Sequence, residues 1–224
     1  MLLFTIVFAT IGIALLNIDK TQLHLLLNSC HTAFGDVFFR LYTTLADYGI
    51  YIMAIGLLFW RAGGTIYMLA SQALGAIITQ IIKHIVNAPR PKIVFNLAET
   101  PDALPIVEGV RMHSCYSFPS GHTCSFFILF FSLSVIVWYY NQNRQAQRKQ
   151  TYLYAILQIA CFILALTGGY SRIYLSQHFT LDVFVGGIIG VCSIIALYPA
   201  FVWFNNKYPN VCAWHISLSK RQNR

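Results

Sequence analysis

Long apolar stretches, separated by short polar segments, dominate the pattern along this chain. Six of them approach the roughly 20 residues that a helix needs to cross the hydrocarbon core of a bilayer. They cover approximately residues 1–17, 41–60, 65–86, 122–140, 151–170 and 182–204. The pattern therefore predicts an all-α polytopic membrane protein with six transmembrane helices, although Asp47 and Tyr48 interrupt the second stretch.

The connections between the expected spans differ in character. Residues 18–40 mix Leu and Phe with polar residues, a pattern typical of one or two amphipathic helices at a membrane surface. Residues 92–118 contain Pro101, Pro105 and Gly109 and are expected to form a loop. No repeat or low-complexity tract divides the sequence, so residues 1–224 are interpreted as one domain.

The composition agrees with a membrane protein. The chain is 57% hydrophobic and 10% charged, whereas soluble domains average about 45–50% apolar and about 25% charged residues. A chain this apolar cannot cover a water-facing surface, which excludes a soluble enzyme, a disordered protein and a nucleic-acid-binding module. The six cysteines lack paired ligand spacing, so no zinc site is expected. We also expect no cofactor.

The distribution of Lys and Arg favours one orientation. With a cytoplasmic N-terminus, the inner side carries eight of the 15 Lys and Arg residues and none of the seven acids. The eight are Arg61, Arg144, Arg148, Lys149, Lys207, Lys220, Arg221 and Arg224. Three of the outer cations, Lys83, Arg90 and Arg172, belong to a cluster of chemically active residues. Without them, eight Lys and Arg residues lie on the inner side and four on the outer side. The positive-inside rule then places both termini in the cytoplasm.

Ionisable and small polar residues gather at the outer ends of four expected spans. In chain order they are Lys83, Arg90, Ser120, Gly121, His122, Arg172, His178 and Asp182. Ionisable residues are expensive at membrane depth and therefore indicate function. Two of these spans begin here, and helix N-termini present free N–H groups to anions. Three fixed cations beside two helix N-termini predict a phosphate-binding site.

Two histidines supply the chemistry that cleavage of a phosphate ester requires. One can attack phosphorus while the other protonates the leaving oxygen. His178 and Asp182 are four residues apart, so on a helix the carboxylate would lie beside the imidazole ring. Such a carboxylate fixes the tautomer and stabilises the developing imidazolium.

These residues resemble the three-part signature of the type 2 phosphatidic acid phosphatase superfamily. The matching segments run from Lys83 to Arg90-Pro91, over Pro119-Ser120-Gly121-His122, and from Ser171-Arg172 through His178 to Asp182. Each signature position is filled in the family's order and spacing. The resemblance also implies six spans with the site at the non-cytoplasmic membrane face.

The resemblance implies a role for each residue. His178 would be the nucleophile that forms a phosphohistidine, Asp182 would orient it, and His122 would be the general acid and later the base. The phosphate oxygens would be held by Lys83, Arg90, Arg172, Ser120 and the Gly121 backbone. Preorganised cations stabilise the charge of the transferring group, so the reaction would need no metal.

A site at the outer membrane surface predicts a lipid phosphate or diphosphate as substrate. The family includes bacterial lipid A, undecaprenyl diphosphate and phosphatidylglycerophosphate phosphatases, and the small size resembles bacterial members. We therefore expect a bacterial inner-membrane protein with its active site facing the periplasm. Lys92 and Arg111 could contact a second phosphate, which a bisphosphorylated glycolipid or a diphosphate would offer. Lipid A is favoured, and undecaprenyl diphosphate follows closely.

Two other classes of protein are alternatives. A non-catalytic lipid-phosphate binder or transporter would use the same cations but would not need His178. A vanadate-dependent oxidase would bind vanadate in place of phosphate, although six apolar spans disfavour that function.

Several other polar residues lie outside the motifs. The histidines interpreted as interfacial or loop residues are His24, His31, His84 and His113. Asp47 either lines the rim of the site or caps a helix. Cys30 and Cys115 both fall on the outer side and could form a disulfide in an oxidising compartment.

Overall fold

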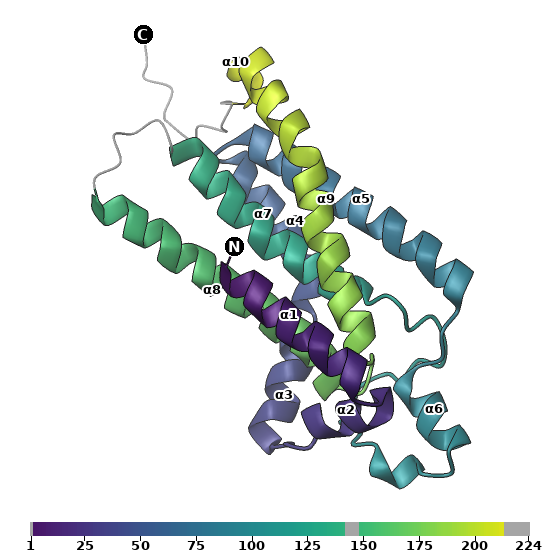
Figure 1. Cartoon of the computed structure of the whole chain (residues 1–224). Helices are drawn as coiled ribbons and strands as arrows, with labels where there is room; N and C mark the ends of the chain where they lie inside the picture. The colour runs from purple at the N-terminus through teal and green to yellow at the C-terminus, as the bar shows by residue number, and fades with distance from the viewer. Residues whose placement is uncertain (1, 142–147, 213–224) are drawn as a thin grey trace.

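The computed structural model describes residues 2–141 and 148–212, and within these ranges the regular elements are all helices (Figure 1). The longer ones are α1 (Leu2–Asn17), α4 (Leu45–Leu58), α5 (Ala62–Val86), α7 (Gly121–Asn141), α8 (Arg148–Tyr174) and α9 (Thr180–Lys207). The shorter ones are α2 (Lys20–Leu27), α3 (Ala33–Tyr42), α6 (Pro91–Leu97), the 3₁₀ helix η1 (Pro101–Ala103) and α10 (Pro209–Cys212). The predicted all-α class is confirmed for the described residues.

Four helical segments are long and apolar enough to cross a membrane. They are Ala62–Leu97 (containing α5 and α6), Gly121–Asn141, Thr151–Tyr174 and Thr180–Lys207. The helices α3 and α4 add a fifth candidate if they are taken as one span, bent by 50° at their junction. The chain is therefore a multi-pass membrane protein. Its described residues contain four or five candidate spans, not the six that the apolar pattern predicts.

The difference lies at the first apolar stretch. Helix α1 has 16 residues, which corresponds to about 24 Å at about 1.5 Å per residue, whereas the hydrocarbon core is about 30 Å thick. In Figure 1 it begins beside the middle of α8 and ends at the level of α2. Its Phe8 packs edge-on against Phe127 of α7. Apolar composition alone could not show that this helix spans only part of the length of the bundle.

The second predicted span also has different boundaries. Residues 33–40, expected to belong to the amphipathic segment, form most of α3, which continues after a bend into α4. At the bend the Thr44 hydroxyl donates to the Leu41 carbonyl at 2.7 Å. Such local side-chain bonds compete with the helical hydrogen-bond pattern. The amphipathic segment therefore contains two helices, α2 and α3, of which α3 belongs to the bent pair.

Helix α7 lies at the centre of the bundle and contacts α4, α5, α8 and α9. Its Phe126, Phe127 and Ile128 are fully buried. Helix α8 can approach because residue 168 is glycine, where an added Cβ would lie 2.2 Å from the Phe126 ring. This close packing fixes the first turn of α7 relative to the ends of α8 and α9.

The helices α2, α3, α6 and η1 gather at one end of the bundle (Figure 1). Residues 92–118 were expected to be a loop, yet they contain most of α6 and all of η1. Both helices begin with proline, Pro91 and Pro101, and proline suits the first helical position because its missing N–H has no partner there anyway. The proline pattern therefore marks two helix starts rather than a continuous loop.

The predicted orientation is not tested by the structure, whereas the possible disulfide between Cys30 and Cys115 is not formed. The expected inner cations Arg144, Lys220, Arg221 and Arg224 lie outside the described residues, so the orientation stays a prediction. Cys30 and Cys115 are exposed free thiols, not a disulfide.

Candidate active site

The structure brings the motif residues together at the end of the bundle where α2, α3 and α6 lie. Lys83 comes from the last turn of α5, His122 from the first turn of α7 and Arg172 from the last turns of α8. His178 follows α8, and Asp182 lies in the first turn of α9. Electrostatic interactions connect His122 with Arg172, His178, Lys83 and Arg90. Four long helices thus contribute their ends to one site.

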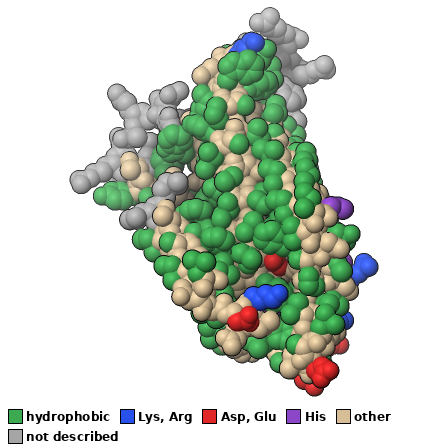
Figure 2. All heavy atoms as spheres, turned by 45° about the vertical axis from the view of Figure 1, so that its right-hand side comes forward, with side chains coloured by type: hydrophobic (Ala, Val, Ile, Leu, Met, Phe, Trp, Pro, Cys, Tyr) green, Lys and Arg blue, Asp and Glu red, His purple; other side chains and the backbone are tan. Residues whose placement is uncertain are grey.

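Most charged side chains on the face drawn in Figure 2 lie in its lower half. On the face drawn in Figure 2, Lys, Arg, Asp and Glu side chains lie around a hollow in the lower part, and a broad hydrophobic surface extends above it. This is the arrangement expected for a protein whose apolar belt faces lipid and whose polar end faces water.

His178 and Asp182 form a buried pair. Nδ1 of His178 lies 3.4 Å from Oδ2 of Asp182, and the side chains are 1% and 6% exposed. The same carboxylate oxygen accepts hydrogen bonds from the Ser117 hydroxyl at 2.5 Å and from the Phe179 N–H at 3.0 Å. Because the carboxylate faces Nδ1, the other ring nitrogen, Nε2, is the one left to react.

The environment keeps this histidine neutral. Burial first, and then the positive charges of Arg172, Arg90 and Lys83, hold the pKa of His178 well below its usual value. A neutral imidazole has a free electron pair on one nitrogen at pH 7. His178 is therefore chemically suited to be a nucleophile.

Both arginines are anchored by neutral acceptors. Arg172 donates through Nη1 to the Thr43 hydroxyl at 2.6 Å, and its buried Nε has no partner among the described residues. Arg90 donates through Nε to the Cys115 carbonyl at 3.0 Å and through Nη1 to both oxygens of Gln177. The three ion pairs found in the described ranges all involve histidine rather than Lys or Arg. The positive charge of both arginines is thus available to an anion.

Ser120 and Gly121 shape the start of α7. Ser120 is buried, and its hydroxyl accepts hydrogen bonds from the Thr123 N–H at 3.3 Å and the Thr123 hydroxyl at 2.9 Å, as a helix cap does. Around Gly121 an added Cβ would meet no atom within 4 Å. The backbone at this helix N-terminus therefore borders open space, where an anion can approach its N–H groups.

The corner between α3 and α4 adds residues that no motif contains. Oδ1 of Asp47 lies 3.4 Å from Nε2 of His122, so Asp47 lines the site rather than capping a helix alone. Thr43 contacts Arg172 from the same corner. Asp47 interrupts an apolar stretch, and the rim of the site was one of the two positions expected for it; Thr43 carries no such signal in the sequence.

Ser117 and Gln177 were also missed, although both lie close to motif residues in sequence. Ser117 holds Asp182, and Gln177 holds Arg90. The Gln177 amide in turn donates to the Arg111 carbonyl at 3.3 Å. Gln177 directly precedes His178 and Ser117 lies two residues before Pro119, but Ser and Gln are too common in loops to be chosen on position alone.

The remaining described histidines differ from one another. His84 is exposed and bonds to the Gln80 carbonyl of its own helix, and His31 contacts Asp36. His113 is exposed on a loop but interacts electrostatically with Arg90, so it faces the cationic site. His24 is fully buried and neither ring nitrogen has a hydrogen-bond partner. Helix α2 packs His24 into the protein interior, and this burial was not part of the expectation of an interfacial or loop position.

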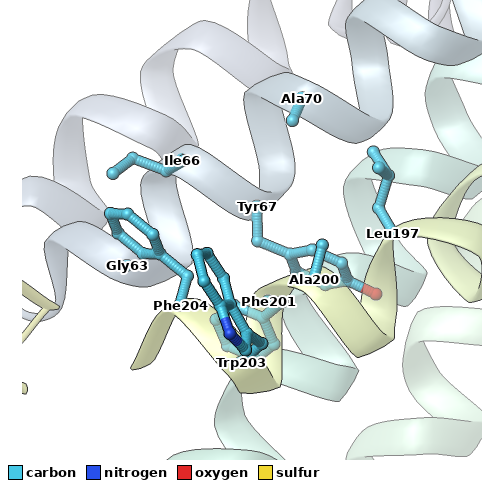
Figure 3. Close-up of a pocket in the computed structure, with 9 residues that line it drawn as sticks. All are labelled: Gly63, Ile66, Tyr67, Ala70, Leu197, Ala200, Phe201, Trp203 and Phe204. Carbon is cyan, nitrogen blue, oxygen red and sulfur yellow. The ribbon is translucent and has the colours of Figure 1, made fainter. Parts of the chain in front are cut away.

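Two cavities elsewhere in the described part of the chain are apolar. One of about 190 Å³ lies between α5 and α9, and aromatic side chains including Tyr67, Trp203 and Phe204 line it (Figure 3). Another of about 260 Å³ lies between α1, α8 and α9. Histidine and carboxylate side chains are absent from the lining of both. No group of three or more His, Cys, Asp or Glu residues in the described ranges could hold a metal ion.

The fold and the site together define a class of protein: a multi-pass helical membrane protein with a cationic, histidine-containing site at one end of its bundle. Residues 64–206 match the model of the PAP2 superfamily. This match covers more than half of the chain, which therefore belongs to the PAP2 superfamily.

Three known proteins illustrate the similarity. The chain is 28% identical over 171 residues to Dolichyldiphosphatase 1 of Mus musculus, a match that covers 72% of this chain and 63% of that protein. It is similar to the crystal structure of Aquifex aeolicus LpxE, with 28% identity, a TM-score of 0.58, and coverage of 79% and 93% of the two chains. It shares its fold with a transmembrane PAP2-type phosphatidylglycerolphosphate phosphatase from Bacillus subtilis, with 18% identity, a TM-score of 0.63 and coverage of 91% and 94%.

Proposed function

We propose that this protein is a lipid phosphate phosphatase that acts through a phosphohistidine intermediate. The observation that carries the proposal is the buried His178–Asp182 pair, whose histidine interacts electrostatically with three cations and with His122. A binding protein would need the cations but not a neutral, oriented imidazole. Membership of the PAP2 superfamily supports the same activity.

In the first step, Nε2 of His178 attacks the phosphorus atom. The bond between phosphorus and the leaving oxygen breaks, and His122 gives a proton to that oxygen. Asp182 holds the ring by its Nδ1 side and stabilises the positive charge that develops on it. Lys83, together with the two arginines, balances the charge on the phosphoryl oxygens.

In the second step, water attacks phosphorus and breaks its bond to Nε2 of His178. His122, which has lost its proton, accepts one from the water. Inorganic phosphate is released and both histidines return to their starting states. The N–H groups at the start of α7, bordered by Gly121, support the phosphoryl oxygens in both steps.

We propose an amphiphilic phosphate as the substrate, because the site lies at the end of a bundle with an apolar surface. Lipid A is our first candidate, and undecaprenyl diphosphate and phosphatidylglycerophosphate are the alternatives. The name of the mouse relative, Dolichyldiphosphatase 1, points to a lipid diphosphate instead. The bacterial inner membrane is the proposed location.

Phosphate release by the full chain in detergent, with EDTA present, tests this function. Wild type and His178→Ala are compared on lipid A, undecaprenyl diphosphate and phosphatidylglycerophosphate. The expected result is release from at least one lipid by wild type, and none above background by His178→Ala. Asp102→Asn is the matched control, since Asp102 is an exposed acid on η1 outside the site. If folded wild-type protein binds a lipid phosphate without releasing phosphate, it is a binder or transporter.

The proposed orientation places both termini in the cytoplasm and the site in the periplasm, which requires an even number of crossings. Four crossings by α5, α7, α8 and α9 meet this condition, and so do six if α1 and the bent pair α3–α4 each cross as well. The exposed thiols of Cys30 and Cys115 lie on the connections at the site end. A membrane-impermeant maleimide applied to cells with a permeabilised outer membrane should label wild type and not Cys30→Ser/Cys115→Ser. Labelling only after lysis would show that the site faces the cytoplasm, opposite to the proposed orientation.

A further inference from the structure

The corner between α3 and α4 places a carboxylate beside the proposed general acid. Oδ1 of Asp47 lies 3.4 Å from Nε2 of His122, and the two side chains are 53% and 34% exposed. Asp47 also attracts Arg172 electrostatically. The neighbouring Thr43 binds Arg172 directly, so the corner is fixed against the site at two points.

This contact limits how far the carboxylate can be from the leaving group. If the leaving oxygen accepts a proton from Nε2 of His122 across a hydrogen bond of about 2.8 Å, it lies within about 6 Å of Asp47 Oδ1, given the 3.4 Å contact. Donation from Nδ1 extends the limit to about 8 Å, since the two ring nitrogens are about 2 Å apart. In either case the leaving group departs close to a negative charge.

We propose that Asp47 makes the site selective for lipid phosphomonoesters over lipid diphosphates; this inference rests on the proposed phosphatase function. A monoester releases an alcohol, which is neutral once His122 has protonated its oxygen. A diphosphate releases a lipid phosphate, which keeps its negative charge and is repelled by the Asp47 carboxylate.

The two substrates also differ in how much their leaving groups depend on the proton from His122. An alkoxide is a poor leaving group, so monoester cleavage depends on the proton from His122. The Asp47 carboxylate attracts the positive charge that His122 carries before it gives up this proton. A phosphate is stable as an anion and leaves with the electron pair of the broken bond without needing a proton. Asp47 therefore favours the monoester through His122 and disfavours the diphosphate through direct repulsion.

The size of the effect follows from Coulomb's law. For one pair of unit charges about 7 Å apart, the rate changes about threefold at the dielectric constant of water and about 50-fold at an effective value near 20. Because Asp47 is half exposed, the expected shift in selectivity lies between these limits.

The test uses farnesyl phosphate and farnesyl diphosphate, which share one lipid chain. The kcat/KM for each is measured with the full chain in detergent for wild type, Asp47→Asn, Asp47→Glu and the control Asp102→Asn. Asp47→Asn should raise the diphosphate-to-monophosphate ratio by about 3-fold to 50-fold, mainly through kcat. Asp47→Glu, which keeps the charge, should stay nearer wild type, and Asp102→Asn should leave the ratio unchanged.

The outcomes separate this inference from the function on which it rests. An unchanged ratio in folded Asp47→Asn, with wild type active, would overturn the selectivity and leave the phosphatase function intact. Equal losses on both substrates would make Asp47 a structural residue and would also overturn it. If Asp47→Asn does not fold, Asp47→Ser replaces it. Absence of phosphate release by wild type from either compound would argue against the phosphatase function and this inference together.

Discussion

Replacing His24 by leucine measures the cost of burying an imidazole without partners. His24 is fully buried on α2, and its ring lies 5.4 Å from the Phe179 ring and 6.1 Å from the Phe95 ring, centroid to centroid. Neither ring nitrogen has a hydrogen-bond partner. Burial lowers the pKa of His24 to about 4, although the attraction of Asp182 opposes part of this shift. The folded state therefore resists protonation.

The direction of the pH effect follows from proton binding. Between about pH 6.5 and 4 the unfolded chain binds a proton at His24 that the folded chain does not, so the free energy of unfolding falls as the pH falls. The full difference amounts to about 3 kcal/mol, of which about 2 kcal/mol is lost by pH 5. Above pH 6.5 both states hold a neutral ring and this contribution is constant.

His24→Leu should remove this pH dependence. At pH 7 we expect it to be more stable than wild type by about 1 kcal/mol or more, because two unsatisfied polar atoms leave the interior. The free energy of unfolding is measured in mixed detergent micelles at pH 7 and pH 5. His84→Leu, which replaces an exposed histidine, is the control and should follow the wild-type pH dependence. The reasoning is refuted if wild type and His24→Leu lose the same stability between the two pH values.

Three further predictions concern the residues that hold the site. Ser117→Ala removes a hydrogen bond to Asp182 and should lower kcat about tenfold with little change in KM; an unchanged kcat would make this bond irrelevant to catalysis. Gly121→Ala fills open space at the start of α7, so thermal unfolding should be unchanged while the KM for phosphate esters rises several-fold. Gly186→Ala would place a Cβ 2.4 Å from the Ser120 carbonyl, which should destabilise the protein by about 1–3 kcal/mol; normal stability would show that α9 can move away from α7.

The sequence allowed the long spans and the motif residues to be predicted, for a physical reason. Crossing a membrane requires long apolar helices, so α7, α8 and α9 are visible in the hydrophobic pattern. The ends of these helices are then marked by the ionisable residues that interrupt it. The short helix α1 shares this apolar pattern, but its packing, which no periodicity reports, decides how far it reaches.

The supporting residues of the site could not be predicted in the same way. Asp47 and Thr43 reach it because α3 and α4 meet at a 50° bend, and the angle between two helices depends on tertiary contacts. The burial of His24 was missed for a similar reason: one histidine in a mixed segment does not show which side of a short helix faces inward. Local patterns identify where helices end, whereas tertiary packing determines which residues of other helices lie beside those ends.

The anchoring of the arginines connects the fold to the proposed chemistry. A buried arginine is usually neutralised by a carboxylate, but Arg172 and Arg90 are held by a hydroxyl, a carbonyl and an amide side chain. These neutral partners fix both guanidinium groups in place without cancelling their charge. Together with Lys83 they bring three positive charges into one site, which is costly in electrostatic energy, and a phosphate dianion relieves that cost. The site therefore has its strongest attraction for the group whose charge it would stabilise during transfer.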